Sequence, residues 1–101
     1  MLRVRNELAA KRRKARHYGV QALYKWHMIG GDPGEIVLEF CDEYDFVNVD
    51  VEYFSNLLHS ISSQVEDLEA VLLPILDRKL DELDPIERSV LRLGTFELKK
   101  R

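Results

Sequence analysis

The sequence has few of the residues that build covalently linked or metal-bound scaffolds. Its 101 residues include one cysteine, Cys41, so no internal disulfide can form, and a lone thiol suits a reducing cytosol. The three histidines, His17, His27 and His59, are scattered and none has a second ligand four residues on, so we expect no metal site. The sequence contains no glycine-rich phosphate loop that would indicate a cofactor. It also contains no isolated carboxylate pair that would indicate a catalytic site. We therefore expect a protein that is not an enzyme and has no cofactor.

Long apolar runs are also missing. The longest, residues 70–76, is interrupted by Pro74 and is much shorter than the roughly 20 residues that cross a bilayer. The charged N-terminus is not followed by the apolar core of a secretory signal. These features predict a cytoplasmic protein with no membrane segment. The hydrophobic fraction of 46% is ordinary for a globular fold, and the length allows a single domain.

Acidic residues are almost absent from the first thirty positions. Residues 1–30 hold eight lysines and arginines but one acidic residue, Glu7, whereas residues 31–101 hold seven basic and 17 acidic residues. The net charge of −3 therefore hides a basic end on an acidic remainder. A footprint of this kind indicates a polyanionic ligand, and nucleic acid is the first candidate.

The basic residues fall on one side of a predicted helix. At helical spacing, Arg13, Arg16 and His17 share a stripe with Tyr24, and Arg12 lies close to Arg16. Guanidinium groups bind phosphates, and a tyrosine can stack on an unpaired base or anchor a protein partner. The ordinary alternative is that the basic run is a solvated helix end and that Tyr24 is a half-buried packing residue.

The apolar periodicity is helical almost throughout and predicts an all-α bundle of about five helices. The first helix is expected from about residue 7 or 10 to residue 28, and Gly30-Gly31 should end it. Pro74 should end or kink the fourth helix. Four residues have the sequence context of a helix N-cap: Asp32, Asp50, Ser63 and Asp84.

The fifth predicted helix, which ends at about residue 99, is apolar on two sides. One stripe consists of Ile86, Val90, Leu93 and Phe96, and a second of Leu91 and Leu98. The preceding helices are expected to cover one stripe, and an exposed apolar stripe is an association site. We therefore expect a homo-oligomer formed through this face, or a poorly ordered C-terminal end.

Three separated blocks of the sequence resemble the NusB family of bacterial transcription antitermination factors. They occur in the family's order and cover most of the chain. The blocks are KRRKARHYGVQALYKW at residues 11–26, DVEYFSNLL at residues 50–58, and LDPIERSVLRLGTFEL at residues 83–98.

The resemblance implies an all-helical fold with an N-terminal subdomain at about residues 1–48. Residues 49–101 would form an incomplete C-terminal subdomain, because family members usually continue into further helices. The implied role is non-catalytic. Such proteins bind the boxA element of single-stranded ribosomal RNA leader transcripts together with NusE, a small-subunit ribosomal protein, and act with other Nus factors on RNA polymerase.

Matching the motifs position by position implies two sets of site residues. The implied RNA-binding residues are Arg12, Arg13, Lys14, Arg16 and, on the exposed side of the last helix, Arg92. The implied partner-binding residues are Tyr24 and Glu87, although a role in the capping box would by itself account for Glu87.

Three other interpretations stay open at the sequence level. The chain could be a helical protein-interaction module whose basic end meets an acidic protein or a membrane surface. It could also be an RNA-binding accessory domain of an RNA-modifying enzyme, without antitermination activity of its own. An enzyme ranks last.

Overall fold

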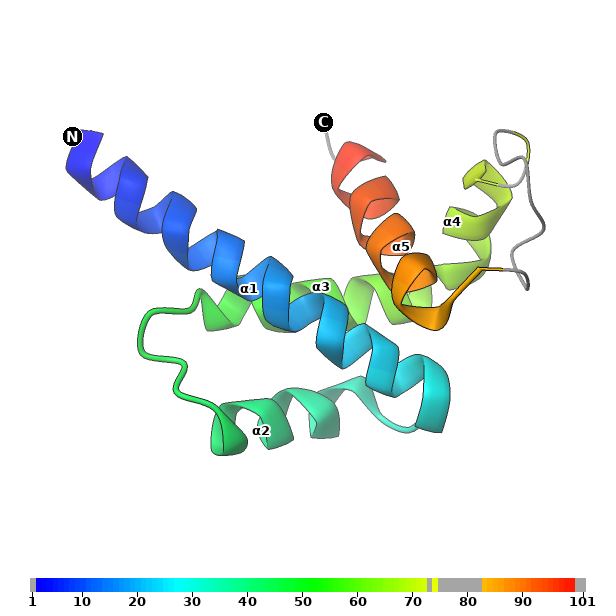
Figure 1. Cartoon of the computed structure of the whole chain (residues 1–101), viewed down its shortest axis with the longest axis horizontal. Helices are drawn as coiled ribbons and strands as arrows, with labels where there is room; N and C mark the ends of the chain where they lie inside the picture. Colours follow the sequence, from blue (N-terminus) through cyan, green and yellow to red (C-terminus); the bar gives the residue numbers. More distant parts are fainter. Residues whose placement is uncertain (1, 73, 75–82, 100–101) are drawn as a thin grey trace.

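The computed structural model of the chain describes residues 2–72, 74 and 83–99. These residues form five helices and no strand, which confirms the predicted all-α class. In chain order the helices are α1 (Leu2–Ile29), α2 (Pro33–Glu43), α3 (Val51–Ser63), α4 (Val65–Leu72) and α5 (Pro85–Lys99). Figure 1 shows α1 crossing the middle of the molecule, with its first turns extending away from the other helices.

Three of the four predicted N-caps are confirmed. Asp32 Oδ1 accepts a hydrogen bond from the Gly34 amide at 2.9 Å, and Asp50 Oδ1 accepts one from the Tyr53 amide at 3.0 Å. At the start of α5, Asp84 Oδ1 accepts a hydrogen bond from the Ile86 amide at 2.8 Å. Each carboxylate satisfies an amide that would otherwise lack a helical partner, so the helix starts are set locally.

Two predicted boundaries are wrong. Ser63 does not cap α4, because it is the last residue of α3 and its hydroxyl donates back to the Ser60 carbonyl at 2.9 Å. The first helix also begins several residues earlier than expected, at Leu2. The predicted end of α1 is confirmed at Gly30 and Gly31, which have φ values of 79° and 96°. The predicted end or kink of the fourth helix at Pro74 stays a prediction, because residues 73 and 75–82 lie outside the described residues.

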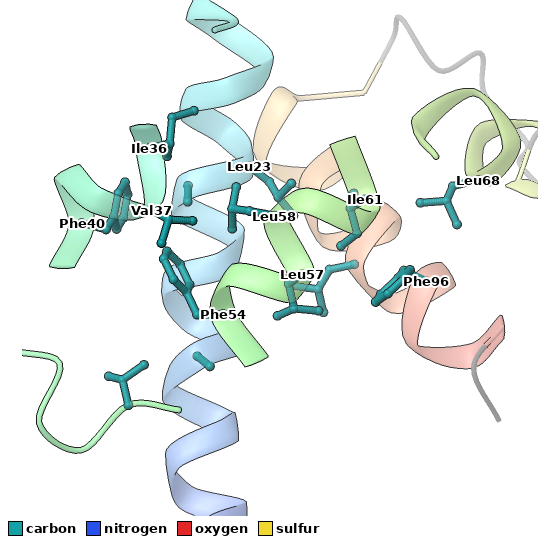
Figure 2. Packing of buried hydrophobic residues seen from close by; sticks show 14 residues of the cluster. Leu23, Ile36, Val37, Phe40, Phe54, Leu57, Leu58, Ile61, Leu68 and Phe96 are labelled. Atoms are coloured by element: carbon teal, nitrogen blue, oxygen red, sulfur yellow. The ribbon is translucent and has the colours of Figure 1, made fainter. Parts of the chain in front are cut away.

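The core is built around α3. Its residues Phe54, Leu57, Leu58 and Ile61 are buried. Figure 2 shows Phe54 on the side of Val37 and Phe40 of α2, and Leu57 and Ile61 on the side of Phe96 of α5. Gly19 lets α1 approach closely, because a Cβ atom there would lie 3.4 Å from side-chain carbons of Leu57 and Leu93. This close packing joins α1, α3 and α5, the helices that carry most of the predicted site.

The buried face of α5 differs from the predicted stripe. The helix buries Ser89, Arg92, Leu93, Thr95 and Phe96. Two members of the predicted stripe, Ile86 and Val90, are each 51% exposed, and Leu98 of the second stripe is also exposed. Leu93 and Phe96 of the predicted stripe are buried, but the rest of the buried face consists of Ser89, Arg92 and Thr95. The buried face is therefore only partly the face that the apolar pattern predicted. The expected association through the exposed apolar residues stays a prediction.

Candidate nucleic-acid interface

Four basic residues of α1 form a surface that we call the basic ridge: Arg12, Arg13, Lys14 and Arg16. The first three are exposed, and Arg16 is half-buried. The three arginines line one shallow hollow together with Arg5 and Leu8, so they lie side by side. The structure therefore brings together the arginines that the sequence singled out at the N-terminal end.

One flank of the ridge faces a polar groove of about 900 Å³ between α1, α3 and α5. Arg16 Nε donates hydrogen bonds to both carboxylate oxygens of Glu97, at 3.0 and 2.7 Å. The Tyr53 hydroxyl donates to Glu97 Oε2. The guanidinium carbons of Arg12 and Arg16 lie 5.0 and 5.6 Å from the centre of the Tyr53 ring, within the range of cation–π attraction. The groove is also lined by Asp50, Glu52 and Asn56.

These contacts leave the two arginines accessible. Arg12 Nε lies 3.5 Å from Asp50 Oδ2, and the side chains of Arg12 and Arg16 retain 48% and 42% exposure. The hydrogen bond to Glu97 raises the pKa of Arg16 above its ordinary value, so the guanidinium is fully charged. Ion pairs with this exposure contribute little to stability, and the exposed parts of both guanidinium groups stay open to a phosphate.

The other flank of the ridge consists of Arg13 and Lys14. Arg13 and Lys14 line a second hollow with His17, Asp45 and other residues of the α1 and α2–α3 region. Within the described ranges, neither Arg13 nor Lys14 forms an ion pair. The ridge therefore has one flank that is held by internal contacts and one that is free to bind an anion.

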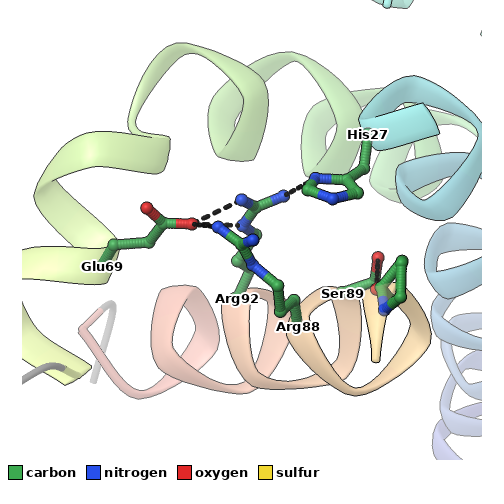
Figure 3. Close-up of polar contacts among 6 residues, drawn as sticks. His27, Glu69, Arg88, Ser89 and Arg92 are labelled. Carbon is green, nitrogen blue, oxygen red and sulfur yellow. Dashed lines mark hydrogen bonds and ion pairs between the residues drawn. The ribbon is translucent and has the colours of Figure 1, made fainter. Parts of the chain in front are cut away.

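Arg92 is not on the exposed side of α5, so that placement is wrong. The residue is only 4% exposed. Its Nε donates to Glu69 Oε1 at 3.1 Å, Nη2 also bonds that oxygen, and Nη1 lies 3.2 Å from His27 Nδ1 (Figure 3). The physical reason is that α4 packs on this side of α5 and supplies a carboxylate for the guanidinium. An RNA contact by Arg92 stays a prediction, for a buried side chain whose three guanidinium nitrogens each have an internal partner.

Arg92 belongs to a group that we call the charge cluster: His27, Glu69, Arg88 and Arg92. Arg88 Nη2 donates to the same Glu69 oxygen at 2.9 Å, so one carboxylate serves two arginines. Burial alone would raise the pKa of Glu69, but the hydrogen bonds from Arg92 and Arg88 and their charges lower it below the ordinary value. The cluster links α1, α4 and α5, and nothing local in the sequence indicated it.

The charge cluster predicts that stability depends on His27 as pH falls. Arginine only donates, so His27 Nδ1 must accept and the ring is neutral. Burial, followed by the charges of Arg92 and Arg88, lowers the pKa of His27. The unfolded chain takes up the proton near pH 6.5 while the folded chain does not, so the free energy of unfolding should fall as the pH drops below about 6.5.

Urea unfolding at pH 7.5, 6.5 and 5.5 tests this expectation. His27→Gln keeps an acceptor for Arg92 but cannot titrate, so its stability should fall less steeply over this interval than that of the wild type. His59→Gln, at an exposed position on α3, is the matched control and should keep the wild-type slope. Equal slopes for the wild type and His27→Gln would show that the histidine does not titrate differently on folding.

The two predicted partner-binding residues lie near one apolar pocket. Tyr24 lines this pocket of about 300 Å³ with Phe40, Tyr44 and Ile86 among others, so α1, α2 and α5 all contribute. Glu87 is exposed and follows Ile86 directly in α5. Tyr24 and the turn that carries Glu87 are therefore on the same side of the molecule.

Sequence reasoning missed the residues that hold the ridge. Tyr53 and Glu97 lie 44 positions apart, and neither has a local pattern that marks it as a partner of Arg16. The only available signal was indirect: both residues lie inside blocks that resemble the same family.

In the part of the chain that the structure describes, no helix is long and apolar enough to cross a membrane. The same residues contain no cluster of His, Cys, Asp and Glu that could hold a metal ion.

Comparison with known proteins gives a consistent result. A model described as the NusB family matches residues 13–101. The transcription antitermination protein NusB of Pseudomonas savastanoi pv. phaseolicola is 50% identical over 93 residues, which are 92% of this chain and 56% of that protein. The protein of the same name from Alcanivorax borkumensis is 48% identical over 90 residues, covering 89% of this chain and 60% of the relative.

A third relative, the transcription antitermination protein NusB of Yersinia enterocolitica, is 44% identical over 92 residues, which are 91% of this chain and 67% of that protein. The chain thus spans between 56% and 67% of the length of these three relatives. The family match covers α1 from residue 13 onward, with three of the four residues of the basic ridge, and all of α2 to α5, including Glu97. By its family match and its similarity to these relatives, the chain belongs to the NusB family.

Proposed function

We propose that the chain is a non-catalytic RNA-binding protein of transcription antitermination. In this proposal it binds boxA-type single-stranded leader RNA together with NusE, and acts with other Nus factors on RNA polymerase. The observation that carries the proposal is the basic ridge, in which neighbouring cations are exposed on one helix of an otherwise acidic protein. The relatives' name, transcription antitermination protein NusB, supports the same role.

The ridge has the chemistry that single-stranded RNA requires. Guanidinium groups hold the phosphate backbone through charge-assisted hydrogen bonds, and they also stack on unpaired bases. The acidic remainder of the chain repels phosphates, which confines the RNA to the N-terminal end. No bond is made or broken in this role, so it needs no catalytic group.

A protein partner would use the apolar pocket that Tyr24 lines. Tyr24 and Ile86 offer apolar contacts there, and Glu87 is the exposed residue that follows Ile86 in α5. Aromatic anchors in pockets with a polar rim are typical of the energetically important parts of protein interfaces. NusE bound at this place would add a second RNA-contacting surface and raise the affinity through the combined attachment.

A titration with labelled RNA tests the proposal. The chain alone should bind a boxA-type strand more tightly than a scrambled strand of the same composition, and NusE should tighten the boxA complex by about ten-fold or more. A boxA strand that is bound no better than its scrambled control, with NusE present, would contradict the sequence-specific role. If NusE raised the affinity for both strands equally, its contribution would be sequence-independent charge alone.

A further inference from the structure

Glu97 is the point at which three helices meet beside the basic ridge. It accepts hydrogen bonds from Arg16 of α1, at 3.0 and 2.7 Å, and from the Tyr53 hydroxyl of α3. Its own side chain, on α5, is 22% exposed. A carboxylate in this position lowers the positive charge of a surface that is proposed to bind RNA. Its presence there therefore calls for a physical reason.

The geometry of the contact supplies that reason. Both hydrogen bonds from Arg16 to Glu97 come from the single Nε–H group. A guanidinium carries four further N–H groups on its two terminal nitrogens, and these two bonds do not use them. The guanidinium carbon lies over the Tyr53 ring, 5.6 Å from its centre. Arg16 is thus held by its Nε–H group and by the Tyr53 ring, while 42% of its side chain stays exposed.

We infer that Glu97 is a positioning residue for RNA binding: it holds the Arg16 guanidinium on the Tyr53 ring by the Nε edge, so that the terminal nitrogens can take a backbone phosphate. The inference rests on the proposed RNA-binding function. A free arginine loses much rotamer entropy when a ligand fixes it, and a side chain that is already fixed loses less. Glu97 therefore contributes affinity although its charge repels RNA.

The two effects of Glu97 can be separated with variants of equal charge. Glu97→Gln removes the negative charge but keeps an oxygen that accepts from Arg16 Nε. Glu97→Met removes the same charge, has a similar length and has no such acceptor. If Glu97 only repelled RNA, the two variants would gain affinity equally. The inference predicts that Glu97→Gln binds single-stranded RNA at least about three-fold more tightly than Glu97→Met.

Two controls show whether the difference passes through Arg16. In an Arg16→Ala background, the Gln and Met variants of Glu97 should bind RNA with equal affinity, because there is no guanidinium to hold. Glu52 lines the same groove and, among the described residues, forms no hydrogen bond or ion pair with Arg16, so Glu52→Gln and Glu52→Met should not differ. A purely structural role would lower the melting temperature of Glu97→Met, but would not create a difference in affinity that disappears with Arg16.

A second pair of variants covers the case in which Glu97→Met does not fold. Tyr53→Phe keeps the ring on which Arg16 lies, whereas Tyr53→Leu removes it. The Leu variant should bind RNA about three-fold more weakly than the Phe variant. This difference should shrink in an Arg16→Ala background, where Arg12 is the one arginine of the pair that still lies over the ring.

The outcomes separate this inference from the proposed function. Folded Gln and Met variants of equal RNA affinity overturn the inference and leave RNA binding intact. If the Met variant does not fold, equal affinities of the Tyr53 pair overturn it. A wild-type chain that binds no single-stranded RNA, in the same titration, overturns the proposed function and the inference together.

Discussion

Replacing Arg12, Arg13 and Arg16 together with alanine is expected to weaken the binding of boxA-type RNA by at least about 100-fold. Each hydrogen bond to a charged group is worth roughly 1.5–3 kcal/mol, and about 1.4 kcal/mol corresponds to a factor of ten. Even if each substitution removes only part of the energy of one such hydrogen bond, the loss of three guanidinium groups together accounts for an affinity about 100-fold weaker. Fluorescence anisotropy with a labelled strand at low salt measures the change.

The stability of the triple variant separates lost binding from lost folding. Arg12 and Arg16 are about half exposed, so their ion pairs contribute little, and we expect the melting temperature to fall by a few degrees. A matched pair of single variants isolates position from charge: Arg13→Ala should weaken RNA binding, while Lys25→Ala, further along the same helix, should not. If the folded triple variant kept the wild-type RNA affinity, the basic ridge would not be the binding site.

Removal of Glu69 is expected to cause the largest loss of stability among the charged residues. The carboxylate serves two arginines, and Arg92 is almost fully buried. Alanine there would remove the carboxylate that pairs with the Arg92 guanidinium, and breaking a buried pair costs roughly 3–5 kcal/mol. Because Glu69 itself is one-fifth exposed, we expect about 3 kcal/mol at the lower end of that range, measured by urea unfolding near pH 7.5.

An exposed ion pair provides the control for this experiment. Glu39 contacts Lys25 on the surface, with side-chain exposures of 52% and 38%. Glu39→Ala removes the same charge and should change the free energy of unfolding by less than about 1 kcal/mol. A similar small effect for Glu69→Ala would mean that water reaches the charge cluster and that its arginines need no internal counter-charge.

The parts of the fold that the sequence predicted correctly are those that depend on neighbouring residues. Asp32, Asp50 and Asp84 each cap a helix through an amide two or three residues away. The two glycines after α1 have the positive φ values that a helix end requires. Ser63 had the same local signal as these caps, but the contact of its hydroxyl with Ser60 let α3 continue to that position.

The parts that the sequence did not predict depend on contacts between distant segments. Arg92 was predicted to be exposed because the residues around it in α5 do not indicate its partner Glu69, which lies 23 positions earlier. The partners of Arg16 in the groove are likewise 37 and 81 positions away. Helical periodicity places the arginines on one helix, but it does not predict which of them form ion pairs with carboxylates of the neighbouring helices. That distinction decides which guanidinium groups are free for RNA.

The salt dependence of RNA affinity tests the central claim most directly. If the basic ridge holds RNA phosphates, the logarithm of the association constant should fall linearly with the logarithm of salt concentration. Its slope for a single strand should be about −0.7 per phosphate, or about −2 to −3 for the three or four cations of the ridge. The triple arginine variant should lose most of this slope. A wild-type affinity that does not change with salt, or an equal slope for the triple variant, would contradict the account.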